Sequence, residues 1–304
     1  MDAIIRAVKN GKKVIAFIEI KARFDEEANL KWAEKLESKG VKVIYSMPGL
    51  KVHSKIAMIR RLVNNKEEFY GYLSTGNFHE KTAELYTDFG LFTADNRIME
   101  EVKRIFNYLE KKSKPKVPFK HLGVGGFNLK EKIKKLIHNE IKVAKDGGKA
   151  YITLKMNSLQ DKEMIDLLYK ASQAGVKIRM IIRGICSLVP GIKGVSENIK
   201  GVSIIDKYLE HARVFIFGNG GDEKIFLSSA DWMVRNLHRR VETMYPIFDE
   251  DLKQFVRNII MIQLNDNVKA RIIDGTDENR YKSTDNQSIR SQYDIYYYIK
   301  SRSL

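Results

Sequence analysis

The chain carries the same order of sequence signals twice, and this internal repeat limits the folds that it can adopt. One copy is centred on His53-Ser54-Lys55 and the other on His211-Ala212-Arg213, and each triplet leads into a short apolar run. Four pairs of landmarks lie at slowly falling offsets of 164, 161, 158 and 154 residues: Gly11 and Gly175, Gly40 and Gly201, His53 and His211, Thr75 and Ser229. A duplicated unit with deletions in its loops explains this drift.

Each copy alternates short strands with amphipathic helices, which predicts an α/β fold with mostly parallel mixed sheets. A basic segment with two prolines, residues 111–118, has no periodicity and separates the copies. We therefore expect two tandem domains, 1–113 and 119–272, related by a pseudo-two-fold axis and followed by a polar, loosely held tail at 273–304. The first helical pattern, residues 3–9, has no strand before it, so we expect an upstream part of the first domain to be missing.

Composition indicates an anionic partner. The formal net charge of +16 over 304 residues favours nucleic acid, lipid head groups, a nucleotide or polyphosphate, although a solvated lysine-rich surface would give the same number. No stretch of 18 apolar residues predicts a transmembrane helix, and the N-terminus lacks a signal-peptide pattern. The single cysteine, Cys186, fits a reducing compartment. We expect a cytoplasmic protein, with a peripheral position on the inner membrane face left open.

The repeated triplet places two functional groups on one face. Side chains alternate along a strand, so His53 and Lys55 project together, as do His211 and Arg213. An imidazole beside a cation suits attack on a phosphate, because one group is nucleophile or base and the other holds oxygens. For one copy alone, a structural histidine at a strand end is the commoner interpretation. Two copies facing each other predict one catalytic cleft that contains both pairs.

Longer motifs around both triplets resemble the polyphosphate kinases of the phospholipase D-like type. In the first copy they are KARFDEEAN at 21–29, PGLKVHSK at 48–55, TGN at 75–77 and LYTD at 85–88. In the second copy they are LKMNSL at 154–159, IRGIC at 182–186, FGNGG at 217–221, SADWM at 229–233 and RRVE at 239–242. The resemblance covers most of the chain, from about residue 3 to about residue 270. It implies two tandem phospholipase D-like domains, the C-terminal catalytic part of a larger enzyme.

The resemblance implies a reaction and a set of roles. The reaction is reversible transfer of the γ-phosphoryl group of ATP to inorganic polyphosphate, through a phosphohistidine at His53 and with His211 as general acid and base. Four cations would hold phosphate oxygens: Lys55, Arg213, Arg23 and Arg183. The residues expected to contact ATP are Arg23, Tyr86, Arg183 and His211, with Tyr86 stacked on the adenine. Surface ion pairing of Arg23 and a core position for Tyr86 are the alternatives.

Supporting residues and the cofactor follow from the same resemblance. Asp88 is expected to orient His53, while Asn77 and Asp231 are expected to hold imidazoles or bound water. Mg²⁺ would arrive with the triphosphate and lie near the Arg23 region, contacting protein only indirectly, because the sequence has no dense carboxylate cluster. Partners would be ATP, ADP and inorganic polyphosphate, with a homo-oligomer for the full-length enzyme. As a fragment, the chain is expected to bind weakly and turn over poorly.

Two other functions stay open from the sequence. A phospholipase D-like phosphodiesterase or nuclease would share the fold and the intermediate. That group continues His-x-Lys with four residues and an Asp, whereas Arg60 and Gly218 occupy the corresponding positions here. A non-catalytic module that binds a polyanion would also fit the charge. Labelling of His53 by ATP favours the kinase, and release of nucleotides from DNA favours the nuclease.

Overall fold

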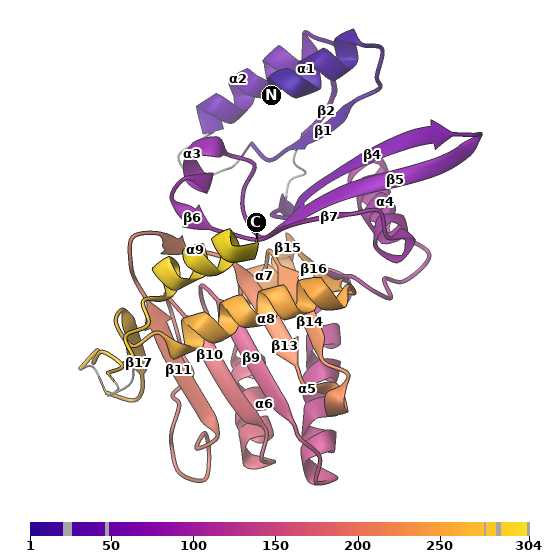
Figure 1. The fold of residues 1–304 in the computed structure, drawn as a ribbon. Helices are drawn as coiled ribbons and strands as arrows, with labels where there is room; N and C mark the ends of the chain where they lie inside the picture. Colours follow the sequence, from indigo (N-terminus) through magenta and orange to yellow (C-terminus); the bar gives the residue numbers. More distant parts are fainter. Residues whose placement is uncertain (21–25, 46–48, 277, 284–286, 303–304) are drawn as a thin grey trace.

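The chain folds into two unequal α/β halves that meet along one edge (Figure 1). The computed structural model describes residues 1–20, 26–45, 49–276, 278–283 and 287–302. The first half contains α1 (Asp2–Lys9), β1 (Ile15–Ile18), α2 (Glu26–Glu37), β2 (Lys42–Tyr45), β3 (Lys51–Val52), β4 (Lys55–Val63), β5 (Lys66–Ser74), α3 (Glu80–Ala83), β6 (Tyr86–Thr87), β7 (Gly90–Thr93) and α4 (Asn96–Lys111).

Two small sheets build the first half. Strands β1 and β2 are parallel and share a small core with α1 and α2 around Ile5, Leu36 and Val41. Strands β4, β5 and β7 form an antiparallel sheet whose long β4–β5 hairpin projects from the molecule (Figure 1). Asn64 and Asn65 both have positive φ, which gives the tight turn that a two-residue hairpin needs.

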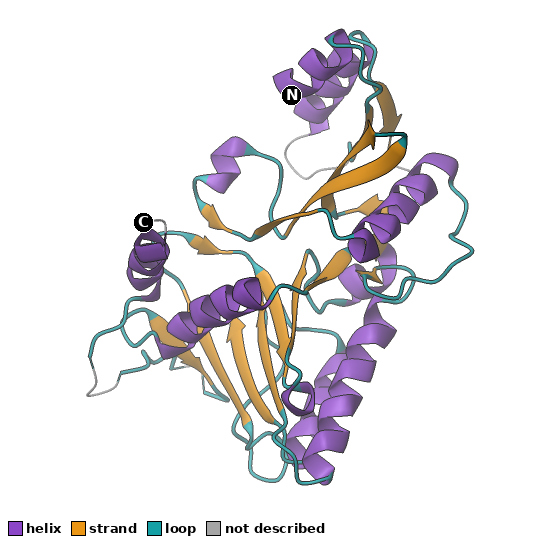
Figure 2. Ribbon diagram, turned by 45° about the vertical axis from the view of Figure 1, so that its right-hand side comes forward, coloured by secondary structure: helices purple, strands orange, loops and turns teal. Residues whose placement is uncertain are grey.

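The second half is built on an eight-stranded sheet. Its elements are β8 (Gly123–Val124), α5 (Leu129–Lys145), β9 (Tyr151–Met156), α6 (Lys162–Gln173), β10 (Lys177–Ile182), β11 (Ile199–Ile204), β12 (Leu209–Glu210), β13 (Arg213–Phe217), η1 (Asn219–Gly221), β14 (Lys224–Ser228), α7 (Val234–Arg239), β15 (Arg240–Val241), β16 (Thr243–Ile247), α8 (Glu250–Asn265), β17 (Ala270–Ile273) and α9 (Ser291–Arg302). Helices α5 and α6 cover one face of the sheet, and α8 and α9 lie on the other (Figures 1 and 2). In the part of the chain that is described, no helix is long and apolar enough to cross a bilayer.

The α/β class is confirmed, but the expectation of mostly parallel strands is wrong. The large sheet has the order β17-β11-β10-β9-β13-β14-β16-β8. Strand β10 is parallel to β9 and β11, whereas the other five neighbouring pairs are antiparallel. A parallel connection needs a long crossover, which α6 provides between β9 and β10. The short link from β13 to β14 makes an antiparallel pair instead.

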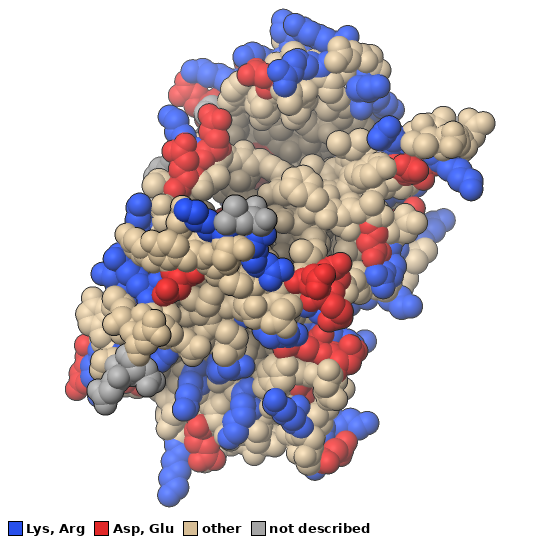
Figure 3. Space-filling view, in the orientation of Figure 1, with Lys and Arg blue, Asp and Glu red and all other residues tan. Residues whose placement is uncertain are grey.

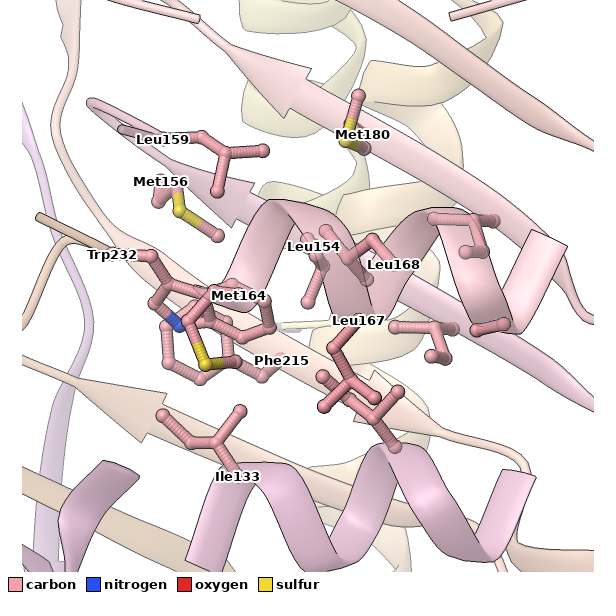
Figure 4. Packing of buried hydrophobic residues seen from close by; sticks show 14 of the residues in the cluster. Ile133, Leu154, Met156, Leu159, Met164, Leu167, Leu168, Met180, Phe215 and Trp232 are labelled. Atoms are coloured by element: carbon pink, nitrogen blue, oxygen red, sulfur yellow. The ribbon is translucent and has the colours of Figure 1, made fainter. Parts of the chain in front are cut away.

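Two apolar layers hold the large sheet between its helices. One layer joins α5 and α6 to the sheet, and Figure 4 shows Ile133 of α5 and Leu168 of α6 against Leu154, Phe215 and Trp232. The other layer includes Val214 and Ile216 of β13 and residues of α4 and α8. Alternate residues of β13 therefore face opposite layers, as a strand covered on both sides requires. This packing fixes the strand ends that carry the site.

The C-terminal segment is held to the body rather than loose. Asp266 accepts hydrogen bonds from the backbone and hydroxyl of Ser291 at 2.8 and 2.7 Å, so it anchors the start of α9. Arg290 forms an ion pair with Asp206 at 2.6 Å. The polar composition of residues 273–304 predicted a loose tail, because composition does not reveal that buried carboxylates elsewhere bind this segment.

Candidate active site

Two short strand pairs join the halves at the site, and they are related by the repeat. Strand β3 pairs in parallel with β15, and β6 pairs in parallel with β12. The first pair leads to His53 on one side and Glu242 on the other, and the second leads to Asp88 and His211. In both pairs a histidine of one half therefore meets a carboxylate of the other half.

His53 is held by Glu242. The Nδ1 atom of His53 lies 2.9 Å from Oε2 of Glu242, whose side chain is fully buried and also accepts from Ser229 and Asn236. Burial alone would raise the pKa of Glu242, but His53 and Lys55 beside it hold that pKa below its usual value. Glu242 is therefore an ionised acceptor, and the proton between the two groups belongs on His53 Nδ1.

This arrangement leaves a lone pair on the other ring nitrogen of His53. Burial lowers the pKa of His53, with Glu242 opposing the shift, so the imidazole is neutral at pH 7. With the proton on Nδ1, the lone pair is on Nε2, for which the described residues provide no hydrogen-bond partner. The His53 side chain is 26% exposed, which gives a ligand access to it.

Asp88 orients His211, not His53 as the sequence analysis expected. His211 Nδ1 lies 2.8 Å from Oδ2 of Asp88, and Thr75 donates to the other carboxylate oxygen at 2.6 Å. Gly76 is required here, because a Cβ at this position would lie 2.1 Å from Asp88 Oδ2. The carboxylate that contacts His53 is that of Glu242. A signal for it existed: the offset of 154 residues that relates Thr75 to Ser229 also relates Asp88 to Glu242.

Arg213 and Lys55 are buried cations with different attachments. Arg213 donates to His211 Nε2 at 3.0 Å and to Oδ2 of Asp231 at 3.1 Å. Since a guanidinium only donates, His211 Nε2 accepts, and its Nδ1–H donates to Asp88. Lys55 Nζ donates to the carbonyl of His53 at 2.5 Å. Burial lowers the pKa of Lys55 to about 7, with Glu242 opposing the shift and Arg213 reinforcing it.

Arg183 and Tyr86 complete the side of the site near His211. Arg183 follows β10 and donates to Oδ1 of Asn157, whose amide donates to the carbonyl of His211 at 3.1 Å. The Tyr86 ring lies 5.0 Å from the His211 ring, centroid to centroid. Burial lowers the pKa of Arg183, and the nearby Arg213 lowers it further. Arg23 lies outside the described residues.

The remaining predicted residues have different environments. Asp231 does not contact an imidazole: its Oδ1 accepts from the backbone of Asn157 at 2.8 Å, and its carboxylate holds Arg213. Asn77 is exposed, and no described residue forms a hydrogen bond with its side chain. The sequence analysis did not single out Arg240, a half-buried guanidinium that acts electrostatically on Lys55 and lies at the start of β15.

A buried polar network supports His211 from behind. Glu210, the neighbour of His211, accepts from Lys155 at 2.5 Å, from Gln263 of α8 at 2.6 Å and from Gln292 of α9 at 2.9 Å. Burial alone would raise the pKa of Glu210, but Lys155 and these donors hold it below its usual value. The C-terminal helix is thus connected to the site through Glu210.

The described residues do not form a cage for a metal ion. No group of three or more His, Cys, Asp or Glu side chains in the described part of the chain has a metal-binding arrangement. Asp88, Asp231 and Glu242 are all engaged by histidine or arginine. Because each is already engaged, these three carboxylates do not fit as ligands of a resident Mg²⁺.

The fold and the paired histidine–carboxylate units define a duplicated α/β protein with one site between its halves. The phosphatidylserine synthase of Haemophilus influenzae has this fold, with a TM-score of 0.53 at 10% identity, covering 99% of this chain and 91% of that one. The polyphosphate kinase of Porphyromonas gingivalis is closer, with a TM-score of 0.92 at 44% identity, covering 99% of this chain and 46% of that one.

The chain belongs to the polyphosphate kinase family. The models "Polyphosphate kinase C-terminal domain 1" and "Polyphosphate kinase C-terminal domain 2" match residues 1–115 and 122–292. The chain is 49% identical to the polyphosphate kinase of Escherichia coli K12 and 50% identical to that of Vibrio cholerae O1, over 99% of its length. It covers 44% and 43% of those proteins, so it spans less than half of the relatives that it matches.

Proposed function

We propose that this chain catalyses reversible transfer of the γ-phosphoryl group of ATP to inorganic polyphosphate, with His53 as the phosphorylated residue. The observation that carries the proposal is the contact of His53 Nδ1 with the buried carboxylate of Glu242 at 2.9 Å. A carboxylate accepts the Nδ1 proton, which leaves the lone pair of Nε2 for attack on phosphorus. Family membership supplies the substrates, because the relatives are polyphosphate kinases.

The transfer proceeds in two displacements. In the first, Nε2 of His53 attacks the γ-phosphorus, an N–P bond forms, and the bond to the β–γ bridging oxygen breaks so that ADP leaves with its electron pair. In the second, a terminal oxygen of polyphosphate attacks the same phosphorus and the N–P bond breaks. Phosphoryl transfer depends mainly on positioning and charge neutralisation. Lys55, Arg183 and Arg213 would supply that positive charge, since Arg213 acts electrostatically on both of the others.

His211 serves the entering or leaving oxygen as base or acid. Its Nε2 carries a lone pair that faces Arg213 at 3.0 Å. When Arg213 donates to a phosphate oxygen instead, that lone pair takes a proton from the terminal phosphate hydroxyl of the acceptor, and it returns the proton in the reverse reaction. Burial lowers the pKa of His211, with Asp88 opposing the shift, so the neutral base is present at pH 7.

The first displacement is the sharpest test, because it is a half-reaction that needs no acceptor. The chain is incubated with γ-labelled ATP and Mg²⁺, and the label on protein is measured after acid and after base treatment. We expect base-stable, acid-labile label that disappears in His53→Ala. The control is His138→Ala, which changes an exposed histidine on α5. Absence of label on the wild-type chain at saturating nucleotide would overturn the proposal and favour a binding module.

A further inference from the structure

A basic cavity lies where β9 and β10 begin, at the end of these strands opposite to Arg183. It has a volume of about 510 Å³ and is lined by the beginnings of β9 and β10, by the loop before β9 and by α8. Its charged lining residues are Lys149, Lys177, Arg179, Arg257 and Glu223. In Figure 3, lysine and arginine side chains stand on this face below α8. We call these residues and the space between them the basic pocket.

Three of the four cations of the basic pocket, Lys149, Lys177 and Arg179, have no carboxylate partner among the described residues. Glu223 is already engaged, since it pairs with Arg257 at 2.6 Å and accepts from Tyr151 at 2.5 Å. Among the described residues, the hydrogen-bond acceptor of Arg179 is the thioether sulfur of Met261 at 3.5 Å, a weak acceptor. No carboxylate among the described residues forms an ion pair with Arg179, Lys177 or Lys149. Three positive charges therefore remain beside the Arg257–Glu223 ion pair, and of these Lys177 donates to the neutral amide oxygen of Asn198.

The like charges of these side chains repel one another, and their combined positive potential attracts anions. Arg179 is half-buried, so its guanidinium has lost part of its hydration without gaining a strong acceptor. A phosphate oxygen is the acceptor that a guanidinium binds best, often with two hydrogen bonds. The pocket therefore has a charge and a donor set that an anion with many oxygens would satisfy.

The spacing of the cations favours an extended anion over a single phosphate. Lys177 and Arg179 are two residues apart on β10, so their side chains share a face about 6.6 Å apart. Lys200 of β11 is the register neighbour of Arg179, about 4.8 Å away, and extends the row beyond the pocket. Lys149 and Arg257 lie on the remaining sides. A chain with a negative charge on every unit can contact several of these cations at once.

We propose that the basic pocket binds a segment of condensed phosphate at a site separate from the catalytic one. Arg179 precedes Arg183 by four residues on or next to β10, which places the two positions about 13 Å apart along the strand. The pocket and the catalytic site are therefore at opposite ends of the same strands. The identity of the anion rests on the proposed function, whereas the need for an anion rests on the pocket itself. A chain bound here is kept close to the protein between transfers.

The test compares two variants that lose the same charge. Lys177→Gln/Arg179→Gln removes two cations of the pocket. Lys12→Gln/Lys39→Gln removes two exposed lysines from the first half, on the far side of the molecule. Binding of inorganic polyphosphate of defined length is measured by calorimetry at fixed ionic strength. We expect the pocket variant to bind about tenfold more weakly or worse, and the control to stay within about twofold of wild type.

Further variants separate binding from folding. Arg179→Lys keeps the charge but loses the forked donor, so its affinity should lie between those of wild type and Arg179→Gln. Lys149→Gln/Lys177→Gln changes only exposed side chains, so it tests the pocket even if replacing Arg179 disturbs the sheet. The salt dependence of affinity should become shallower in the pocket variants, because fewer counterions are exchanged. Equal affinities for wild type, the pocket variants and the Lys12/Lys39 control would overturn the proposal.

Failure of this inference is distinguishable from failure of the proposed function. Labelling of His53 by ATP should be unchanged in the pocket variants, because they leave the catalytic residues in place. One outcome is that the wild-type chain takes no label while Lys177→Gln/Arg179→Gln binds polyphosphate more weakly than wild type. In that case the kinase proposal fails, and the pocket stands as a polyanion site. If label appears and affinity is indifferent to the pocket, only the second site is refuted.

Discussion

Replacing Glu242 with Gln tests the central feature of the site, the proton position on His53. The carboxylate of Glu242 accepts from His53 Nδ1 at 2.9 Å, from Ser229 and from Asn236 at 2.6 Å, so all of its contacts use it as an acceptor. An amide has one oxygen and one NH₂ group. In Glu242→Gln the NH₂ must face one of these donors, and if it faces His53, the lone pair moves to Nδ1 and the proton to Nε2.

The wrong tautomer removes the nucleophile without removing the ring. Buried carboxylate–histidine pairs of this kind lose roughly 10³–10⁴-fold in rate when the carboxylate becomes an amide. We expect a loss of this size in the rate constant for labelling of His53 by γ-labelled ATP, measured by rapid quench. A matched control is Glu140→Gln, because Glu140 is also fully buried and accepts hydrogen bonds from two backbone groups far from the site.

Nitrogen NMR of His53 gives an independent readout of the same change. The wild type should show a protonated Nδ1 and an unprotonated Nε2, and Glu242→Gln should increase the opposite tautomer. A labelling rate within about threefold of wild type in Glu242→Gln would refute the reasoning. So would a wild-type spectrum with the proton on Nε2.

Four further predictions follow, three from the geometry of the site and one from the core. Asp88→Asn should slow transfer from phosphohistidine to polyphosphate more than it slows labelling of His53, because Asp88 contacts His211; comparing the two half-reactions checks this. Binding of a phosphate anion should raise the pKa of Lys55 from about 7. Calorimetry in buffers of different ionisation enthalpy should therefore show that binding takes up about one proton at pH 8 and almost none below pH 6. Lys55→Met should abolish this proton uptake. The rate of His53 labelling should fall in acid, because a protonated imidazole has no lone pair for attack. Since burial lowers the pKa of His53, this fall should occur at a lower pH than for an ordinary histidine. Leu168→Ala, in the fully buried core of the second half, should lower the free energy of unfolding by about 2–5 kcal/mol in chemical denaturation.

The repeat in the sequence predicted the parts of the site that depend on local order. Strand alternation placed each histidine beside its cation, and the structure has Lys55 and Arg213 within hydrogen-bond reach of His53 and His211. The strand ends that carry Arg183 and the polar residues after β9 also follow from local pattern. These features need only the period of a strand and the order of the elements.

The pairing between halves could not be predicted from local pattern. Asp88 lies in the first half, so proximity in the sequence suggested His53 as its partner. The structure pairs Asp88 with His211 because β6 joins β12, while β3 joins β15 and brings Glu242 to His53. Which copy a strand end faces depends on how two folded halves dock, and that is a property of long-range packing.

The same docking made the strand directions hard to anticipate. Hydrophobic runs with β-branched residues identify strands, yet they carry no information on whether a neighbour is parallel. The number of residues between strands is the better guide, since α6 allows a parallel return and the short link after β13 forbids one. The last helix was missed for a different reason: its anchors, Asp206 and Asp266, are buried carboxylates distant in sequence.

Two substitutions between the copies explain why the paired histidines are not equivalent. In the second half the cation is Arg213, and Asp231, which corresponds to Asn77 at the offset of 154, anchors it against His211 Nε2. In the first half the cation is Lys55, which donates to the carbonyl of its own histidine and leaves Nε2 open. Arg213, which Asp231 holds in place, therefore occupies Nε2 of His211, whereas Lys55 makes no such contact with Nε2 of His53. Duplication supplies two similar histidine–carboxylate units, and the difference in their cations supports the proposed roles of His53 as the nucleophile and His211 as the acid and base.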